Sequence, residues 1–222
     1  RCSLLLESPE STLLVDAPPE LRLQLTREQV RKVDAVLITH SHADHVMGLD
    51  DIRRFNELMG KPMPLFAQPS VLDDIRRIFR YAFVPPSQEG GGLPSYELHP
   101  VPETLSLPGM EVRIFEVLHG RLPVLGLRVG NFAYITDVSD IPEKVWGILE
   151  GVEVLVLDAT REAPHPSHFH RERAVEVAQA LGARQTFLTH LSHDYDYEIT
   201  RRALPPGIDL CYDGLEFWVP GA

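Results

Sequence analysis

With 222 residues, the chain is long enough to bury a large core, as one α/β or all-β domain. Its 21 basic and 32 acidic residues give a net charge of -11, which disfavours a surface that coats a polyanion but leaves room for a local basic pocket. Cys2 and Cys211 form neither a CxxC pair nor a disulfide framework, and no apolar run approaches the ~20 residues that span a bilayer. No signal-peptide pattern opens the chain, so these features indicate a cytoplasmic protein without a membrane partner.

The first half of the chain predicts short strands and helices in alternation. Short apolar runs predict four strands, at 3–6, 12–15, 35–38 and 64–67. A capping-box pattern from Thr26 to Gln29 predicts a short helix that runs to about Lys32. Longer helices are expected at 48–59 and 69–79. The Pro- and Gly-rich stretch 84–95 predicts a loop, either a binding loop or a plain connection.

In the second half, strands come first and then alternate with helices. Six strands are expected, at 96–98, 112–118, 124–129, 132–136, 154–157 and 185–189. Three helices are expected, at 141–149 with Pro142 in the first turn, at 171–181 before Gly182, and near 199–203. A closing hairpin is predicted from 208–211 and 216–219. No repeat or domain boundary is evident, so we expect one domain over 1–222 in which helices cover sheets.

The stretch from Thr39 to His45 has the pattern HxHxDH and follows a predicted buried strand. Imidazole nitrogen and carboxylate oxygen are ligands for zinc and similar divalent ions. In an extended segment His40 and His42 project to the same side, so both can reach one ion. Asp44 and His45 follow as the chain turns and can reach a second ion. The pattern is expected by chance about once in a thousand chains of this composition, which makes a metal site the better interpretation.

Further His and Asp residues follow other predicted strands. Each comes directly after an apolar run, as His40 does: His119, Asp137, Asp158 and His190. A rigid strand that ends in a polar residue presents that residue at the edge of a sheet. Five strand ends of one chemical kind are therefore expected to converge on one place.

The convergence predicts a binuclear metal site. Seven ligands are expected, three for each ion and one bridge: His40, His42 and His119; Asp44, His45 and His190; and Asp137. Two ions roughly 3.5–4 Å apart can hold a hydroxide between them and stabilise the attacking and leaving oxygens of a displacement. Hydrolysis of a carboxylic or phosphoric ester follows as the expected chemistry. Zinc and manganese both suit the ligand types.

The order of these residues resembles the metallo-β-lactamase superfamily over essentially the whole chain. The resemblance implies an α/β fold, a four-layer αββα sandwich with the site at one edge of two facing sheets. The β-lactamase branch itself commonly has a cysteine where Asp137 stands, so hydrolysis of antibiotics is not expected.

The C-terminal part is similar to PhnP-like phosphodiesterases, which open a cyclic ribose phosphate. Three stretches carry the similarity: 187–196, 203–207 and 212–216. The resemblance implies that His168 binds a phosphoryl oxygen or protonates the leaving group, tasks that suit an imidazole whose pKa is near neutrality. His165 and His170 are the alternatives for this role. The resemblance also implies a homodimer.

PhnP-like proteins often carry an N-terminal cysteine-rich segment whose thiolates, with the histidine that matches His193, hold a structural zinc. No such segment precedes Arg1 in this sequence. We therefore expect either that an N-terminal segment is missing from this chain or that His193 supports the active site by hydrogen bonds.

Two further residues have open roles. Asp158 either orients an imidazole or caps local structure. Arg121 either contacts a phosphate or is an ordinary surface arginine. Asp44 is expected to act in catalysis as well as in metal binding, beside His168.

We expect the protein to be a metal-dependent hydrolase that cleaves a small phosphodiester, either a cyclic ribose phosphate or a nucleotide-like molecule. The expected nucleophile is a hydroxide that bridges two zinc or manganese ions. A tRNA 3′-processing endonuclease is an alternative that the acidic net charge disfavours, so nucleic acid is not the expected partner. A thioester or lactone hydrolase on the same scaffold stays open. The alternative outside enzymes is a metal-binding regulatory protein.

Overall fold

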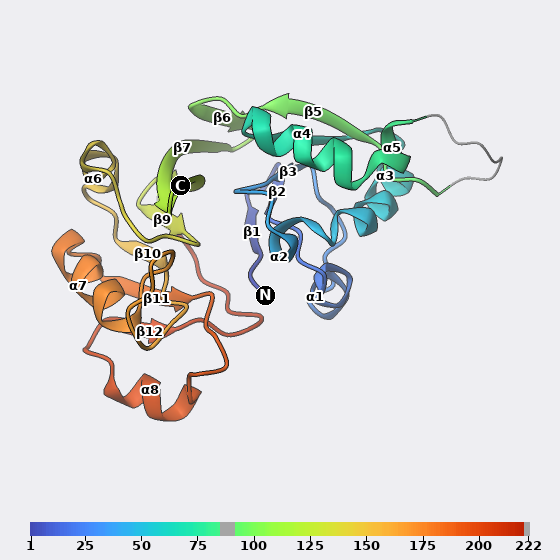
Figure 1. Ribbon diagram of the computed structural model, residues 1–222. Coiled ribbons are helices and arrows are strands. Elements are labelled where there is room, and N and C mark those ends of the chain that lie inside the picture. Colours follow the sequence, from blue (N-terminus) through green and yellow to red (C-terminus); the bar gives the residue numbers. More distant parts are fainter. Residues whose placement is uncertain (85–91, 220–222) are drawn as a thin grey trace. The chain divides into compact units, whose positions relative to one another are not determined.

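The computed structural model describes residues 1–84 and 92–219, and the chain forms two compact units. The first comprises residues 1–102 with 107–109, and the second comprises 103–106 with 110–222. Each unit has one sheet with helices packed against it, which together supply two sheets and two sets of helices (Figure 1). The predicted α/β class is therefore confirmed, while the expectation of a single domain over 1–222 stays a prediction.

The sheet of the first unit has five strands in chain order: β1 (Leu4–Glu7), β2 (Thr12–Val15), β3 (Ala35–Leu37), β4 (Met63–Ala67) and β5 (Tyr96–Pro100). β1 and β2 form an antiparallel hairpin, and the remaining pairs are parallel. β2 and β3 are buried along their whole length, as expected of strands in a parallel sheet. Because β2 and β3 are parallel, the residues that follow them emerge at the same edge of the sheet.

Six helical segments belong to this unit: α1 (Leu21–Arg27), α2 (Ala43–Val46), the 3₁₀ helix η1 (Leu49–Ile52), α3 (Arg53–Met59), α4 (Pro69–Ile78) and α5 (Arg80–Phe83). Their apolar faces form one core with the strands, to which Leu21, Ile52 and Ile75 contribute fully buried side chains. Gly48, between α2 and η1, has to be glycine because a Cβ there would lie 2.0 Å from the carbonyl oxygen of Pro18. This close approach fixes how the chain leaves α2.

The sheet of the second unit has seven strands: β6 (Thr104–Leu107), β7 (Met110–His119), β8 (Leu122–Val129), β9 (Phe132–Ile135), β10 (Val154–Asp158), β11 (Gln185–Thr189) and β12 (Ile208–Leu210). Each strand again neighbours the next one along the chain, from β6 at one edge to β12 at the other. β8 is antiparallel to both β7 and β9, whereas β9 to β12 are parallel to one another. The C-terminal ends of β7, β9, β10 and β11 therefore lie at one edge of this sheet.

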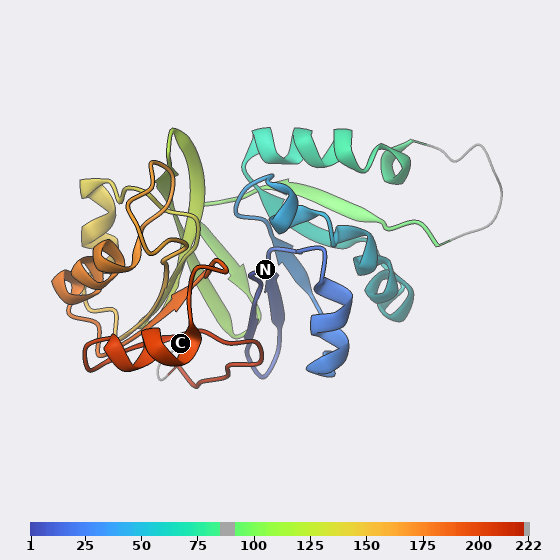
Figure 2. The same cartoon turned by 60° about the horizontal axis from the view of Figure 1, so that its bottom comes forward.

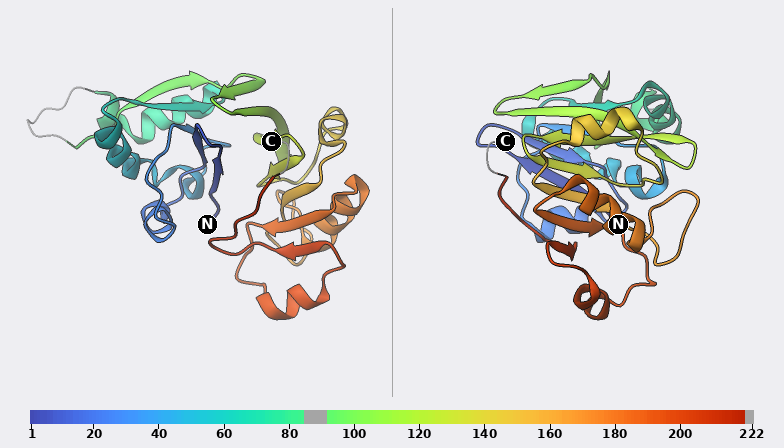
Figure 3. Two further views of the ribbon diagram at one scale, coloured as in Figure 1. Left: turned by 180° about the vertical axis from the view of Figure 1, so that it is seen from behind. Right: turned by 90° about the vertical axis from the view of Figure 1, so that its left-hand side faces the viewer.

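Three helices complete the second unit: α6 (Glu143–Leu149), α7 (Arg171–Leu181) and α8 (Tyr197–Ala203). Figure 2 shows α6 and α7 on the same face of the sheet, where Val145 and Val177 join the core. α8 lies beside β12 (Figure 3). As predicted, α7 ends at Gly182, which adopts a left-handed conformation with φ of 69°. Among the described residues, no helix is both long and apolar enough to cross a bilayer.

One predicted helix is wrong. The Thr26–Gln29 pattern was expected to begin a helix, but α1 ends at Arg27. The Thr26 hydroxyl donates to the carbonyl oxygen of Arg22 at 2.7 Å, so it bonds back into the preceding turn instead of capping a new helix. The apolar side chains that hold this helix, Leu21 and Leu25, precede the capping pattern.

The predicted C-terminal strand at 216–219 is also wrong, since no strand forms there. Phe217 instead stacks on Phe187 and contacts Phe132, at ring-centroid distances of 5.3 and 5.6 Å. β12 pairs with β11 in parallel, not with a returning hairpin strand.

Other departures are smaller. The helix predicted at 48–59 divides into η1 and α3, and three short elements were not predicted: β6, α2 and α5. The predicted loop 84–95 lies mostly outside the described residues, and its described parts, Val84 and 92–95, contain no helix or strand.

Candidate metal centre

In the first unit, the HxHxDH motif occupies the segment that leaves β3 and enters α2. His40 Nε2 and His42 Nδ1 lie 3.0 Å apart, and their rings meet edge to face. Asp44 Oδ2 lies 3.7 Å from His45 Nε2. The ring centroids of His40 and His45 lie 4.1 Å apart, so the histidines of this motif form one cluster. Ser41, which alternates with the histidines, points away from them and donates its hydroxyl to Asp74 Oδ2 in α4, at 2.7 Å.

Asp16 supports these histidines from the end of β2. Its Oδ1 accepts a hydrogen bond from the Thr39 N–H, and its Oδ2 accepts from the Thr39 hydroxyl and from His45 Nδ1, all at 2.8 Å. His40 Nδ1 in turn lies 3.1 Å from the Thr39 hydroxyl oxygen. Because these contacts engage Nδ1 of His40 and His45, Nε2 is the nitrogen through which each imidazole can bind a metal ion.

Asp16 and Thr39 were missed by sequence reasoning, although a signal for Asp16 exists. It follows a buried apolar strand, as the predicted ligands do. It also has φ of 61°, a conformation that is uncommon for residues other than glycine. Thr39 directly precedes the first predicted ligand, and its hydroxyl joins Asp16 to His40.

In the second unit, three predicted ligands follow strands of the large sheet. His119 ends β7, and its Nδ1 lies 2.5 Å from the carbonyl oxygen of Ser167. Asp137 and His190 follow β9 and β11, and Asp137 Oδ1 lies 3.4 Å from His190 Nε2. Both residues have positive φ, 49° and 60° respectively. Strained backbone of this kind is concentrated at functional sites.

Asp158, at the end of β10, supports this second cluster. Its Oδ1 accepts from the hydroxyl of Thr160 at 2.6 Å, and that hydroxyl oxygen lies 2.7 Å from His190 Nδ1. Its Oδ2 lies 2.9 Å from His168 Nδ1 and accepts from the Val138 N–H. One buried carboxylate therefore holds two histidines, one directly and one through a threonine. Thr160, like Thr39, was not singled out from the sequence.

His168 lies next to the predicted ligands of this unit. Its ring centroid is 4.5 Å from that of His119 and 5.4 Å from that of His190. Ligand-capable atoms of Asp137, His168 and His190 all lie within 4.8 Å of one another. Since Nδ1 faces Asp158, Nε2 is the nitrogen that can meet a substrate.

The two alternatives to His168 are placed differently. His165 is exposed, with its ring 5.7 Å from that of His168. Partial desolvation and the nearby His168 and Arg161 lower the pKa of His165 below its usual value. His170 precedes α7 as its N-cap residue. The connection that carries these residues is braced by Tyr195, whose hydroxyl contacts the carbonyl oxygens of Ala159 and Arg161 at 2.6 and 2.7 Å.

Two predicted site residues stand apart from these clusters. Arg121 is exposed at the turn between β7 and β8, and no hydrogen bond or ion pair involves it within the described chain. The His193 side chain is 92% exposed and lies 3.6 Å from Asp194 Oδ1. Neither belongs to a group of potential metal ligands in the part of the chain that the structure describes.

The donor set fits divalent ions in both units. Four imidazoles have Nδ1 directed at protein oxygen, which leaves Nε2 as the ligand atom: His40, His45, His119 and His190. Asp44 and Asp137 each approach one of these histidines with a carboxylate oxygen. Histidines oriented by second hydrogen bonds, with carboxylates close to their Nε2, are typical of metal centres.

Comparison of the sequence with known proteins gives matches that cover most of the chain. The family model of the beta-lactamase superfamily domain matches residues 11–191. The chain is 30% identical over 250 residues to a ribonuclease Z of Methanopyrus kandleri, a match that covers 96% of this chain and 89% of that protein. It is also 33% identical over 217 residues to an octanoyltransferase of Porphyromonas gingivalis. That match covers 96% of this chain but 43% of the octanoyltransferase, so this chain spans less than half of that protein's length.

Solved structures with the same fold also cover nearly all of this chain. A diphosphatase from the PhnP family is 37% identical, with a TM-score of 0.88 over 96% of this chain and 81% of that one. The short form of human tRNase Z has a TM-score of 0.76 over 99% of this chain and 92% of that one, at 18% identity, and so shows the shared fold alone.

Proposed function

Because the chain belongs to the metallo-β-lactamase superfamily and resembles the PhnP family within it, we propose that it is a metal-dependent phosphodiesterase that acts on a small substrate. The observation that carries this proposal is the placement of His168. It lies beside Asp137 and His190, and its Nδ1 is held by Asp158. A histidine held in this way beside metal ligands can protonate a leaving oxygen.

We propose seven residues as ligands of two divalent ions, zinc or manganese: His40, His42, Asp44, His45, His119, Asp137 and His190. When bound, such ions activate water as a nucleophile and neutralise charge on a phosphoryl group. Asp16, Thr39, Asp158 and Thr160 orient the imidazoles. Asp44, the most exposed of the proposed carboxylate ligands, is also the one most accessible to the attacking water.

His168 has the contacts of a general acid. In the proposed reaction the oxygen of water bonds to phosphorus and that water releases one proton to solvent, the bond from phosphorus to the leaving oxygen breaks, and His168 Nε2 gives its proton to the leaving oxygen. The carboxylate of Asp158 holds Nδ1 of the imidazole, so Nε2 is directed outward for the transfer. His168 then regains a proton from solvent.

The relatives support phosphoryl over acyl substrates. The diphosphatase acts on a phosphoryl linkage, and ribonuclease Z is a nuclease, so both names concern phosphorus–oxygen bonds. The net charge of -11 favours a small substrate over tRNA. The octanoyltransferase keeps an acyl substrate as the second candidate, but more than half of that protein lies outside the match. A homodimer is a separate proposal, which sedimentation analysis would test.

The proposal is tested by a substrate panel with zinc and manganese each added back to metal-free protein. The panel compares bis(p-nitrophenyl) phosphate and a nucleoside diphosphate with a thioester and a lactone. Turnover of the phosphoryl compounds is expected, and activity confined to the thioester and lactone would contradict the proposal. His168→Ala should lower turnover with metal content unchanged. Loss of metal from this variant would show that His168 is a ligand instead.

A further inference from the structure

The connection that follows β10 is fastened to the segment that follows β11 through three consecutive carbonyl oxygens. The Tyr195 hydroxyl lies 2.6 Å from the carbonyl oxygen of Ala159 and 2.7 Å from that of Arg161, so its proton is shared between them. Between these two, the Thr160 carbonyl oxygen accepts a hydrogen bond from the Ser192 N–H at 3.1 Å. The backbone on both sides of Thr160 is therefore held by the segment after β11.

The Thr160 hydroxyl, in turn, determines how His190 is oriented. It donates to Asp158 Oδ1 at 2.6 Å, a carboxylate that takes the single hydroxyl proton. The contact of 2.7 Å with His190 Nδ1 then needs a proton from the histidine. A proton on Nδ1 leaves the lone pair on Nε2, the atom that lies 3.4 Å from Asp137 Oδ1. His190 therefore presents Nε2 as a metal ligand because the Thr160 hydroxyl is in place.

The place of this hydroxyl depends on the backbone of Thr160. Threonine is branched at Cβ, so its χ1 angle has few favoured values and the direction of the hydroxyl follows the backbone. The peptide group before Thr160 is held by the Tyr195 hydroxyl, and the one after it by the Ser192 N–H. Because the Ser192 contact comes from the main chain, Tyr195 supplies the side chain through which this placement can be changed.

Tyr195 is itself held in place at both ends of its segment. It lies five residues after His190, which directly follows β11. The next residue, Asp196, accepts a hydrogen bond from the Ile199 N–H at 2.9 Å and so caps α8. Burial raises the pKa of the Tyr195 phenol above its usual value, so the hydroxyl keeps its proton and remains a donor. The phenol is therefore a fixed donor between β11 and α8.

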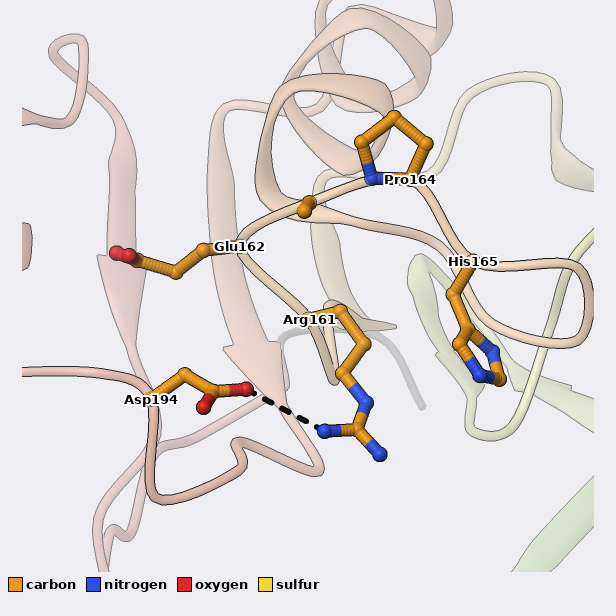
Figure 4. Close-up of a pocket in the computed structure, with 6 residues that line it drawn as sticks. Arg161, Glu162, Pro164, His165 and Asp194 are labelled. Atoms are coloured by element: carbon orange, nitrogen blue, oxygen red, sulfur yellow. Dashed lines mark hydrogen bonds and ion pairs between the residues drawn. The ribbon is translucent and has the colours of Figure 1, made fainter.

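A second side-chain contact between the same two segments is weaker. Arg161 Nη1 donates to Asp194 Oδ2 at 3.3 Å (Figure 4). Both side chains line an open hollow of about 580 Å³, and they are 41% and 39% exposed. Exposed ion pairs of this kind contribute little, because water solvates and screens both charges. The half-buried phenol of Tyr195 is therefore the side chain that fastens the connection.

We propose that Tyr195 is a positioning residue of the metal centre, which acts through Thr160 to keep His190 with its proton on Nδ1 and its lone pair on Nε2. The inference rests on the proposed function, because His190 is a metal ligand only in that proposal. In the described chain the Tyr195 hydroxyl bonds to backbone carbonyls, so its effect on His190 is indirect.

The first test is nitrogen NMR of the metal-free protein, which reports the ring nitrogen of His190 that has the proton. Spectra are recorded at about pH 8.5, where an ordinary imidazole is neutral. We expect the proton on Nδ1 in the wild type. Tyr195→Phe keeps the ring and removes the hydroxyl, so a fraction of His190 should shift its proton to Nε2. A wild type with the proton on Nε2, or a variant with an unchanged tautomer, would overturn the proposal.

Metal affinity is the second readout, measured by competition with a fluorescent chelator for zinc. Tyr195→Phe should weaken binding about tenfold, the lower end of what a group that orients a ligand contributes. Thr160→Val removes the hydroxyl that Tyr195 positions, so the double variant should bind no more weakly than Thr160→Val alone. Losses that add in the double variant would overturn the proposal, because Tyr195 would then act independently of Thr160.

Tyr197→Phe is the matched control, because it removes a second phenol of this region, which donates to the carbonyl oxygen of Leu210 at 3.4 Å. Arg161→Gln breaks the exposed ion pair and leaves the Tyr195 hydroxyl in place. Both variants should keep the wild-type tautomer and affinity. If either control shifted the tautomer as Tyr195→Phe does, any loosening of the region would suffice and the proposal would be wrong.

A rescue variant separates positioning from folding. Tyr195→4-aminophenylalanine keeps the ring and offers N–H donors to the same two carbonyls, so it should restore the tautomer and the affinity. Circular dichroism would verify that each metal-free variant is folded, and a folded rescue variant that restores neither readout would overturn the proposal. The NMR test needs no metal and no substrate. A tautomer that depends on Tyr195 in a protein without metal binding or hydrolysis would therefore refute the proposed function alone.

Discussion

The Oδ2 atom of Asp158 lies 2.9 Å from Nδ1 of His168, and this contact fixes which nitrogen of the histidine faces outward. Asp158→Asn replaces a charged acceptor with a neutral amide, so the contact that orients the imidazole is weakened. We predict that kcat for a phosphodiester falls about 10²-fold, within the range of a general acid's contribution, while KM changes little. Steady-state kinetics and metal analysis would measure both effects. If the variant instead loses metal in proportion to activity, Asp158 acts through His190 and the assignment to His168 is wrong.

Thr160 provides a second prediction, because its hydroxyl lies between Asp158 and His190. Thr160→Val keeps the shape of the side chain but leaves His190 Nδ1 without its acceptor. We expect the free energy of unfolding of the metal-free protein to fall by about 1–3 kcal/mol, the cost of an unsatisfied buried polar group. Urea titration would measure it.

Thr160→Ser is the control for this prediction. It restores the hydroxyl and should recover most of the stability and of the metal affinity. Equal losses in the serine and valine variants would mean that the methyl group, not the hydroxyl, stabilises this region.

Asp16 predicts a matching effect in the first unit. Its carboxylate accepts bonds from Thr39 and from His45, and it is completely buried. Asp16→Asn keeps the side-chain size, and asparagine tolerates the positive φ of 61°. We expect metal affinity to fall about 10–100-fold, as is usual when a group that orients a ligand is removed. Competition with a fluorescent chelator would measure it, and Asp74→Asn, which affects Ser41 alone in this segment, should bind metal normally.

Metal stoichiometry tests the ligand assignment as a whole. We predict two ions per chain in the wild type, and Asp137→Ala should weaken both because Asp137 is the proposed bridge. Mass spectrometry under native conditions would count the ions. A single tight ion in the wild type would contradict the binuclear assignment. Loss of one ion with the other unchanged in the variant would contradict the bridging role of Asp137.

Cys211 gives a prediction on pH. Burial raises the pKa of its thiol from 9.0 to about 11, because the thiolate is disfavoured in the folded chain. A group whose pKa is raised on folding stabilises the fold below its unfolded pKa, and this contribution is lost as the pH rises through the folded value. We expect the stability difference between wild type and Cys211→Ala to shrink by about 2 kcal/mol between pH 8 and pH 11. Urea titrations at the two pH values would show it, and an unchanged difference would mean that the thiol is not desolvated.

The sequence predicted site residues correctly where a histidine or an aspartate directly follows a buried strand. His119, Asp137 and His190 were found because each follows an apolar run, and β7, β9 and β11 do end there. Asp16 met the same criterion but stands alone, without histidines beside it. Thr39 and Thr160 could not be found in this way, because threonine is common in strands and its function here depends on partners distant in the chain.

Two errors in the predicted fold have physical causes that local patterns do not carry. The Thr26–Gln29 pattern fits a helix start, but the apolar residues Leu21 and Leu25 place the helix before it. The strand at 216–219 was expected as the second arm of a hairpin, yet the ring of Phe217 packs on Phe187 and no strand forms there. In both cases tertiary packing prevailed over local propensity.

Because β9, β10 and β11 are parallel, their C-terminal ends lie together and are held by the sheet, while the connections that follow them can vary in sequence. The proposed ligands Asp137 and His190 are anchored to strand ends, whereas residues 161–165 belong to the surface connection between β10 and α7. Substitutions or length changes in that connection would alter the surroundings of His168 without moving the strand ends. Laboratory evolution could therefore diversify this short segment alone and search for new specificities on an unchanged hydrolytic scaffold.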